Sequence, residues 1–252
     1  MVTARPFPFS SLFPYFGGKS IIGHLYPEPS YRTLIEPFAG GASYSLRYYE
    51  RDVTLTDLWE PVYQVWKFVT SPDALRICRD RVPETVEAGQ TIEEFAKPDD
   101  PIGLIYLMQS QFAQSAFGMS VRNRVSPFGA KCWGTFRERI EFWLPRIQHW
   151  KVFHMSYADI PNQTATWYVD PPYANDAGSK YKESNVDYVH LGAWCKARLG
   201  QTIVAENKGA CWLDFKPLTK KRAAGFAVSA DASAMSEVIW TQQSDENVGV
   251  FA

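Results

Sequence analysis

Short apolar runs alternate with segments of helical periodicity along most of the chain. Five of these runs have the length and the β-branched or aromatic content of buried strands, and they lie at residues 33–36, 53–57, 151–155, 165–169 and 201–205. Val228 and residues 237–240 mark the last strands. Strands that alternate with helices predict an α/β fold with an open, mostly parallel sheet.

The helical segments carry their apolar residues on one side. Residues 89–101 are polar and rich in turn formers, which indicates a boundary, and a second apolar helical run follows at 102–114. We therefore expect a sheet domain formed by residues 1–75 and 150–252, and a mostly helical lobe inserted at 76–149. In the helical segment 58–81 the apolar side is formed by Trp59, Val62, Val65, Trp66 and Val69.

Composition narrows the class of protein. The chain has 252 residues, of which 46% are hydrophobic and 15% aromatic, so it has enough apolar material for one large domain with an inserted lobe. The net charge is −1, so a nucleic-acid partner would need a local basic surface.

The cysteines and histidines show no metal-ligand spacing and no disulfide framework. Free thiols in a reducing cytoplasm fit the cysteines, and we expect no bound metal. The N-terminus lacks a cationic segment followed by an apolar one, and no stretch approaches ~18 apolar residues, so we expect a protein that is neither secreted nor membrane-spanning. The four cysteines are Cys78, Cys132, Cys195 and Cys211, and the four histidines are His24, His149, His154 and His190.

The strand at 33–36 runs into a glycine-containing loop, Pro37-Phe38-Ala39-Gly40-Gly41-Ala42-Ser43, and a helical segment follows at 44–50. Strand, glycine loop and helix form the opening unit of a nucleotide-binding α/β sheet, because glycines let the backbone approach a ligand and the helix N-terminus offers free amides. The next strand ends at Asp57. An acid about 20 residues past such a loop is placed to accept hydrogen bonds from ribose hydroxyls.

The run at 165–169 ends in Asp170-Pro171-Pro172-Tyr173. An acid, two rigid prolines and an aromatic ring place a hydrogen-bond acceptor, a bare carbonyl and a stacking platform at the carboxyl end of a strand. This set suits chemistry on an exocyclic amino group of a planar substrate. A strand followed by a proline-stiffened turn is the alternative for an isolated match of this kind.

Taken in order, Tyr15-Phe16-Gly17-Gly18-Lys19, the loop at 36–43, Asp57 and the DPPY residues resemble the Dam-like, α-class family of N6-adenine DNA methyltransferases. The motif matches cover about residues 15 to 173, with weaker similarity onward to 240. The resemblance implies a Rossmann-like, S-adenosylmethionine-dependent methyltransferase sheet with an inserted target-recognition lobe, and double-stranded DNA as the partner. The loop departs from the pattern because its third expected glycine is Ala42.

The same resemblance implies the residues of the site. Asp170, Pro171, Pro172 and Tyr173 would form the catalytic pocket. Lys19 would pair with the methionine carboxylate, Asp57 would bind the ribose, and Pro37 and Phe38 would pack against the apolar parts of S-adenosylmethionine. The full set of implied cofactor contacts is Tyr15, Gly17, Lys19, Glu36, Pro37, Phe38, Gly40, Asp57 and Asp170.

The chemistry of adenine methylation fits these residue types. The amino lone pair is delocalised into the ring, and Asp170 and the carbonyl of Pro171 can each accept one amino hydrogen and so favour a pyramidal nitrogen. We expect Asp170 to act mainly as an oriented acceptor, because a carboxyl of ordinary pKa near 3.9 is a weak base. The adenine must flip out of the duplex, and Tyr173 would stack on it.

A basic segment lies between Asp57 and the DPPY residues. Residues 101–137 contain no Asp or Glu, and the stretch at 118–129 is expected to form two short strands or a loop. This is where the resembled family carries its target-recognition segment, so DNA contacts are predicted at Arg122, Asn123, Arg124 and Lys131. A solvated basic surface loop is the alternative.

The sequence is also compatible with some other methyl-transfer reactions, and it argues against one. Methylation at a cytosine carbon needs a cysteine that follows a proline, and none of the cysteines does. Asp170 favours adenine as the substrate. Related N4-cytosine methyltransferases more often carry Ser at this position, and protein-glutamine methyltransferases typically carry Asn. Methylation of an RNA base or of a cytosine amino group stays as an alternative, as does a catalytically silent nucleic-acid-binding module.

Overall fold

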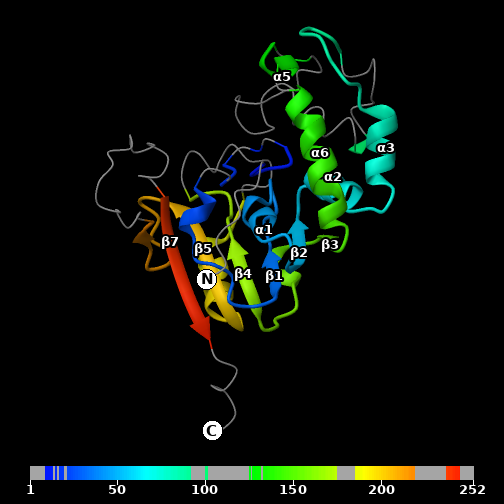
Figure 1. The fold of residues 1–252 in the computed structure, drawn as a ribbon. Helices are drawn as coiled ribbons and strands as arrows, with labels where there is room; N and C mark the ends of the chain where they lie inside the picture. Colours follow the sequence, from blue (N-terminus) through cyan, green and yellow to red (C-terminus); the bar gives the residue numbers. More distant parts are fainter. Residues whose placement is uncertain are drawn as a thin grey trace, which may run out of the picture.

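The computed structural model describes residues 9–13, 15, 17–19, 22–91, 100–101, 125, 127–131, 133–174, 185–218 and 237–244. Its described strands form one sheet in the order β3-β2-β1-β4-β5-β7-β6 (Figure 1). The strands are β1 (Thr33–Glu36), β2 (Asp52–Asp57), β3 (Lys151–His154), β4 (Ala165–Val169), β5 (Gly200–Asn207), β6 (Lys216–Pro217) and β7 (Glu237–Ser244).

The strand order reverses at β1, which pairs in parallel with β2 on one side and with β4 on the other. β3 and β5 continue the parallel pairing outward, whereas β7 runs antiparallel to β5 and to β6. At such a switch point the carboxyl ends of the strands open a crevice, which is where α/β proteins bind ligands. The strands that carry the glycine loop and the DPPY residues therefore flank this crevice.

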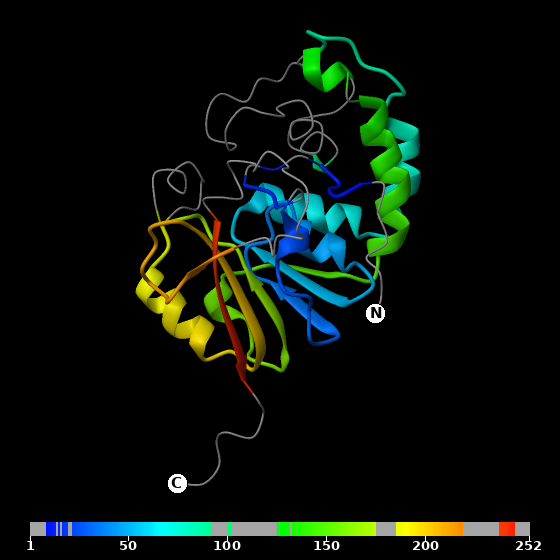
Figure 2. The same ribbon diagram turned by 60° about the vertical axis from the view of Figure 1, so that its left-hand side comes forward.

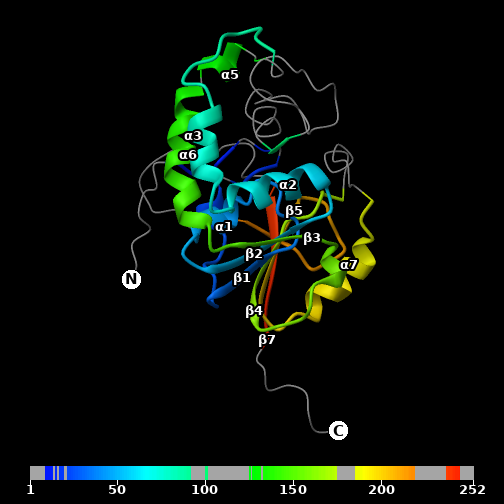
Figure 3. The same ribbon diagram turned by 90° about the vertical axis from the view of Figure 1, so that its right-hand side faces the viewer.

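Successive residues of the central strands face opposite sides of the sheet. Leu34 and Tyr168 belong to one apolar core cluster, whereas Ile35 and Trp167 belong to the other. The first cluster is covered by the 3-10 helix η1 (Gly23–Leu25), α1 (Ser43–Arg47) and α2 (Glu60–Val69), and the second by α7 (Tyr188–Lys196) on the opposite side (Figure 3). Because both faces are buried, the strands appear in the sequence as nearly continuous apolar runs.

Helices α3 (Ala74–Arg81) and α6 (Trp133–Ile147) lie side by side next to the sheet (Figure 2), joined by an ion pair between Arg79 and Glu141. Trp133 and Phe136 of α6 are buried in the same apolar cluster as Leu34 of β1. The described part of the predicted lobe thus shares a continuous core with the sheet. The division of the chain at 75/76 and 149/150 stays a prediction.

Two predicted elements differ from the structure. The single helix expected at 58–81 is in fact two helices, α2 and α3, because Pro72 stands in the turn between them and a proline interrupts helical hydrogen bonding. The strands or loop expected at 118–129 are wrong at their described end, where α5 (Pro127–Lys131) begins with a proline, a residue suited to the first turn of a helix. Residues 102–114 and Val228 lie outside the described residues.

Membrane-spanning helices, free thiols and metal-binding clusters can be assessed for the described residues. None of the helices they form is long and apolar enough to cross a membrane. Cys78, Cys195 and Cys211 are free thiols. No cluster of three or more His, Cys, Asp and Glu side chains in this part of the chain could hold a metal ion.

Candidate active site

A tight turn joins β1 to α1 and forms one wall of the crevice. Gly40 and Ala42 have positive φ angles of 44° and 45°, a region in which only glycine is unstrained. Asp57, at the end of β2, braces the turn because its Oδ2 accepts a hydrogen bond from the Gly40 N–H at 3.1 Å. The alanine in the third glycine position therefore keeps the left-handed backbone that a glycine would favour.

The glycines of this turn also make room for an aromatic ring. A Cβ added to Gly40 would lie 2.8 Å from Cε1 of Tyr15, and one added to Gly41 would lie 2.8 Å from the Cβ of Tyr15. The sequence indicated one role for these glycines, the close approach of a ligand, and the structure adds a second one. They seat the tyrosine of the N-terminal motif against the loop, which brings two separate motifs together.

A cavity of about 310 Å³ occupies the crevice. It crosses the switch point, since its walls come from the ends of β1, β2 and β4 and from the segment after β3. The structure brings all nine predicted cofactor-binding residues to this cavity: Tyr15, Gly17, Lys19, Glu36, Pro37, Phe38, Gly40, Asp57 and Asp170. Their contacts with a cofactor stay a prediction.

Several lining residues were not predicted from the sequence. Ser156 and Tyr157 follow β3, and the ring of Tyr157 lies 5.4 Å from that of Phe38, measured between centroids. Trp59 and Asp187 also line the cavity. The signal that could have found Tyr157 is its position, because it follows a parallel strand at the edge of the sheet where ligands bind.

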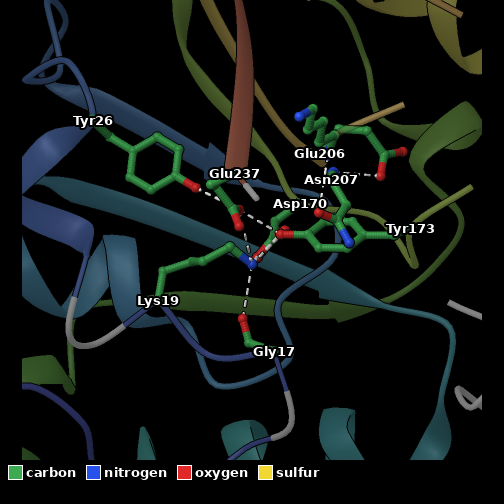
Figure 4. Close-up of polar contacts among 9 residues, drawn as sticks. Gly17, Lys19, Tyr26, Asp170, Tyr173, Glu206, Asn207 and Glu237 are labelled. Atoms are coloured by element: carbon green, nitrogen blue, oxygen red, sulfur yellow. Dashed lines mark hydrogen bonds and ion pairs between the residues drawn. The ribbon is translucent and has the colours of Figure 1, made fainter. Parts of the chain in front are cut away.

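Lys19, which is buried, and Asp170, which is partly buried, form an ion pair in the wall of the cavity (Figure 4). The ammonium donates to both carboxylate oxygens of Asp170, at 2.9 and 2.8 Å, and to the carbonyl oxygen of Gly17 at 2.8 Å. These three acceptors match the three donors of a lysine. The observed partner of Lys19 is therefore the DPPY acid, and its predicted contact with the methionine carboxylate stays a prediction.

Burial raises the pKa of Asp170 to about 6, and the negative charges of Glu237 and Glu206 add to this rise, whereas Lys19 opposes it. The expectation of an ordinary pKa for this carboxyl was therefore wrong, because it ignored how deeply the end of β4 is buried. A carboxylate with the higher pKa still accepts hydrogen bonds above pH 6, and it takes up a proton more readily.

The remaining DPPY residues are held by neighbours from other elements. The Tyr173 hydroxyl donates to Oε1 of Glu237 at 2.5 Å, and the Lys19 ammonium lies 4.9 Å from the centroid of the Tyr173 ring. Pro171 and Pro172 are buried, and the carbonyl of Pro172 accepts a hydrogen bond from the Tyr188 hydroxyl at 2.7 Å. Glu237 was predicted only as part of a strand.

Glu36 is a buried acid in the wall of the cavity, at the end of β1. Its Oε2 accepts hydrogen bonds from the backbone N–H and the hydroxyl of Ser45. Burial raises the pKa of Glu36 to about 8, although the hydrogen bonds from Ser45 lower it. This carboxyl is therefore mostly neutral at pH 7, which differs from the charged acid that an exposed glutamate would present.

The predicted DNA-binding residues divide into two groups. Lys131 is exposed at the end of α5. Arg122, Asn123 and Arg124 lie outside the described residues. The predicted role of all four in DNA binding stays a prediction.

The strand order, the switch-point cavity and the DPPY acid on its wall define a Rossmann-like, S-adenosylmethionine-dependent methyltransferase. Residues 15–206 match the family model for the D12 class N6 adenine-specific DNA methyltransferases, and the chain belongs to this family. Comparison with curated protein sequences gives no match. The resemblance seen in the sequence motifs is confirmed, and the protein is an S-adenosylmethionine-dependent enzyme that methylates adenine in DNA.

Proposed function

We propose that the protein holds S-adenosylmethionine across the switch-point cavity and methylates the N6 amino group of an adenine flipped out of double-stranded DNA. One observation carries this proposal. Asp170, the acceptor for the amino group, lines the same cavity as the glycine loop and Asp57, which are suited to the cofactor. Methyl donor and methyl acceptor therefore meet in one space.

The cavity fits the chemistry of the cofactor. Both oxygens of Asp57 already accept backbone hydrogen bonds, from Gly40 and from Trp59. Asp57 also lines the cavity, and an acid at this position of the fold is placed to accept hydrogen bonds from ribose hydroxyls. The rings of Phe38 and Tyr157 provide an apolar end for the cofactor adenine, at the side of β2 and β3.

Bound S-adenosylmethionine supplies a methyl group on a cationic sulfur. Asp170 and the carbonyl of Pro171 accept the two hydrogens of the target amino group and so direct its lone pair toward that methyl. The amino nitrogen becomes cationic as it is methylated, and Asp170 then accepts the proton that leaves it. The raised pKa of Asp170, about 6, makes the carboxylate a better proton acceptor than an exposed aspartate.

Base flipping is the second part of the proposal. A base within the duplex cannot present its amino group inside a cavity, so the adenine must leave the stack at a cost of a few kcal/mol. Stacking on Tyr173 returns about 1–3 kcal/mol of this cost. The contacts of Tyr173 with Glu237 and Lys19 hold its ring in place before the base arrives.

Site specificity would come from the inserted lobe. We place the DNA contacts at Arg122, Asn123, Arg124 and Lys131, in the acid-free segment that the sequence shows between residues 101 and 137. Arginine forks read guanine edges, and lysine contacts phosphate. We expect DNA and cofactor to meet in the cytoplasm, the location predicted from the sequence.

Methyl transfer from tritiated S-adenosylmethionine tests the proposal. We expect label on unmethylated duplex DNA, none on RNA, and N6-methyladenine as the only modified nucleoside after digestion. Label on RNA or on cytosine would replace the proposal with one of the alternatives, and no label on any nucleic acid would favour a silent binding module. Sequencing DNA from a methylation-free host that expresses the chain would give the recognition site.

A further inference from the structure

Glu237 enters the active site from a strand that carries no methyltransferase motif. It is the first residue of β7, and because β7 is antiparallel to β5, its N-terminal end lies beside the carboxyl ends of the parallel strands. Glu237 pairs with Asn207 in the register of these two strands. It also lies beyond residue 206, where the family match ends.

The carboxylate of Glu237 is buried and bound by three side chains. Its side chain is 7% exposed, and its Oε1 accepts hydrogen bonds from the hydroxyls of Tyr26 and Tyr173, at 2.8 and 2.5 Å. The ammonium of Lys19 lies 3.6 Å from the same oxygen. Figure 4 shows these groups converging on the space between Lys19 and Tyr173.

Tyr173 is therefore fixed at more than one point. Its hydroxyl is held by Glu237, and the Lys19 ammonium lies over its ring. The next residue, Ala174, donates its backbone N–H to Oε2 of Glu206 at 3.2 Å. A tyrosine held at both ends keeps one ring orientation, so a flipped base meets a stacking surface that is already in place.

The charges around Lys19 are unequal. Two carboxylates, the buried Glu237 and the partly buried Asp170, lie within 4 Å of one ammonium. This local excess of negative charge favours a substrate nitrogen that gains positive charge as it is methylated, since fixed charges in a buried site stabilise the charge that develops there.

We propose that Glu237 is a positioning residue for methyl transfer, which orients the Tyr173 ring and the Lys19 ammonium without itself touching the target base. This inference rests on the proposed function, because it requires an adenine to stack on Tyr173. Glu237 acts through two neighbours, so its loss should change the rate of methyl transfer much more than the affinity for S-adenosylmethionine.

The test uses the full chain and four variants. Glu237→Gln removes the charge, Tyr173→Phe removes the other end of the same hydrogen bond, and the double variant combines them. Glu141→Gln is the matched control, since it makes the same exchange at an exposed ion pair with Arg79. Single-turnover methylation of an unmethylated duplex and calorimetric affinity for S-adenosylmethionine are measured for each.

We expect Glu237→Gln and Tyr173→Phe each to slow single-turnover methylation about ten- to hundredfold, the range for a hydrogen bond to a charged group. The double variant should be no slower than the slower single variant by more than about twofold, because Glu237→Gln weakens and Tyr173→Phe removes the same hydrogen bond. Affinity for S-adenosylmethionine should stay within about threefold. The control should match the parent in both measurements.

The pH dependence of the rate separates positioning from a merely structural role. Asp170 is faced by charged or titratable groups from several elements, and Glu237 is one that raises its pKa. Removing that charge should move the acidic limb of the rate profile to lower pH, whereas Tyr173→Phe keeps the charge and should leave the limb in place. The groups that face Asp170 are Lys19, Tyr26, Glu36, Tyr168, Tyr173, Glu206 and Glu237.

Three outcomes would overturn the inference. In the first, Glu237→Gln methylates DNA at a rate within twofold of the parent. In the second, Glu237→Gln lowers the affinity for S-adenosylmethionine by the same factor as the rate. In the third, the double variant slows the reaction by the product of the two single effects. If Glu237→Gln does not fold, Tyr173→Phe alone must slow the reaction about tenfold for the inference to stand. A parent enzyme that transfers no methyl to DNA would overturn the proposed function and this inference together, whereas an active parent confines any failure to Glu237.

Discussion

The Nζ atom of Lys19 lies 2.8 Å from Oδ2 of Asp170, although 151 positions separate the two residues in the chain. This contact joins the lysine of the N-terminal motif to the acid of the DPPY motif. It couples the residue proposed to bind the cofactor to the residue proposed for catalysis, because a change in either partner alters the charge of the other's surroundings.

Replacing Asp170 should stop catalysis. Asp170→Asn keeps the size of the side chain but presents an NH2 group toward the target amino group and weakens the contact with Lys19. We expect the single-turnover rate to fall at least about a hundredfold, as it does when a group that stabilises developing charge is lost. Asp214→Asn, at an exposed position, is the control. Near-normal turnover of Asp170→Asn would contradict the assignment.

Replacing Lys19 should change the pH profile of the reaction. Lys19 lowers the pKa of Asp170, so Lys19→Met should raise that pKa above its present value of about 6. More of the carboxyl is then protonated at pH 7, and the acidic limb of the rate profile moves to higher pH. Rates measured from pH 5 to 9 at saturating cofactor check this shift. A profile identical to that of the parent would show that the ion pair does not govern Asp170.

Asp57→Ala should weaken cofactor binding more than turnover. Its carboxylate lies away from the reacting methyl, so it supplies binding that is equal in the ground state and the transition state. We expect affinity for S-adenosylmethionine to fall about ten- to hundredfold, the range for a charged hydrogen bond. Calorimetry measures the affinity. Asp52→Ala, at the exposed start of β2, should bind normally.

Glu36 should make the free energy of unfolding depend on pH. Its folded pKa of about 8 lies above the ordinary value of 4.5, so the folded state binds its proton more tightly than the unfolded chain does. The resulting stability is fully present below about pH 4.5 and is lost as the pH rises toward 8. Glu36→Gln removes this pH dependence. Each unit of difference between the folded and unfolded pKa corresponds to about 1.4 kcal/mol in the free energy of unfolding.

Urea unfolding at pH 5, 6, 7, 8 and 9 gives the free energy of unfolding of the parent and of Glu36→Gln. The difference in free energy of unfolding should favour Glu36→Gln increasingly from pH 5 to 8 and then level off. The same difference at every pH would show that Glu36 keeps an ordinary pKa.

Arg122 and Arg124 should have distinct effects on DNA binding. Replacing an arginine that reads a guanine should cost about 1–3 kcal/mol and relax specificity at one base pair, whereas replacing a phosphate contact should weaken all sequences and reduce the salt dependence by about one unit. Titrations of Arg122→Ala and Arg124→Ala against cognate and single-base-variant duplexes, at several salt concentrations, separate these roles. Unchanged affinity, salt slope and site preference in both variants would remove this segment from the interface.

The central strands β1, β4 and β5 could be predicted because burial on both faces leaves apolar runs that are hard to mistake, whereas the two-residue, exposed β6 was not predicted. The nine residues predicted to bind the cofactor line one cavity, and those at or just after the ends of β1, β2 and β4 do so because the ends of parallel strands converge at one edge of the sheet. Tyr15, Gly17 and Lys19 were predicted only from the family resemblance, and contact of all nine with the cofactor stays a prediction. The break between α2 and α3 was missed, since the apolar periodicity continues past Pro72 and only the local backbone conflict reveals the turn.

Two features of the site could not be predicted from the sequence, because they depend on contacts between distant parts of the chain. Glu237 lies in no motif, and its place in the site follows from the antiparallel docking of β7. The raised pKa of Asp170 depends on burial and on charges contributed by β5 and β7. Local patterns carry neither kind of information.

The hydrogen bond between Tyr26 and Glu237 spans 211 positions, and this has a consequence for the order in which the enzyme is made. Chains fold from the N-terminus as they leave the ribosome. Both signature motifs emerge well before β7, so a growing chain carries them while Tyr26 and Tyr173 still lack their shared partner, Glu237. The proposed active site is assembled only when β7 has docked, so methylation requires synthesis to continue past the family motifs to residue 244.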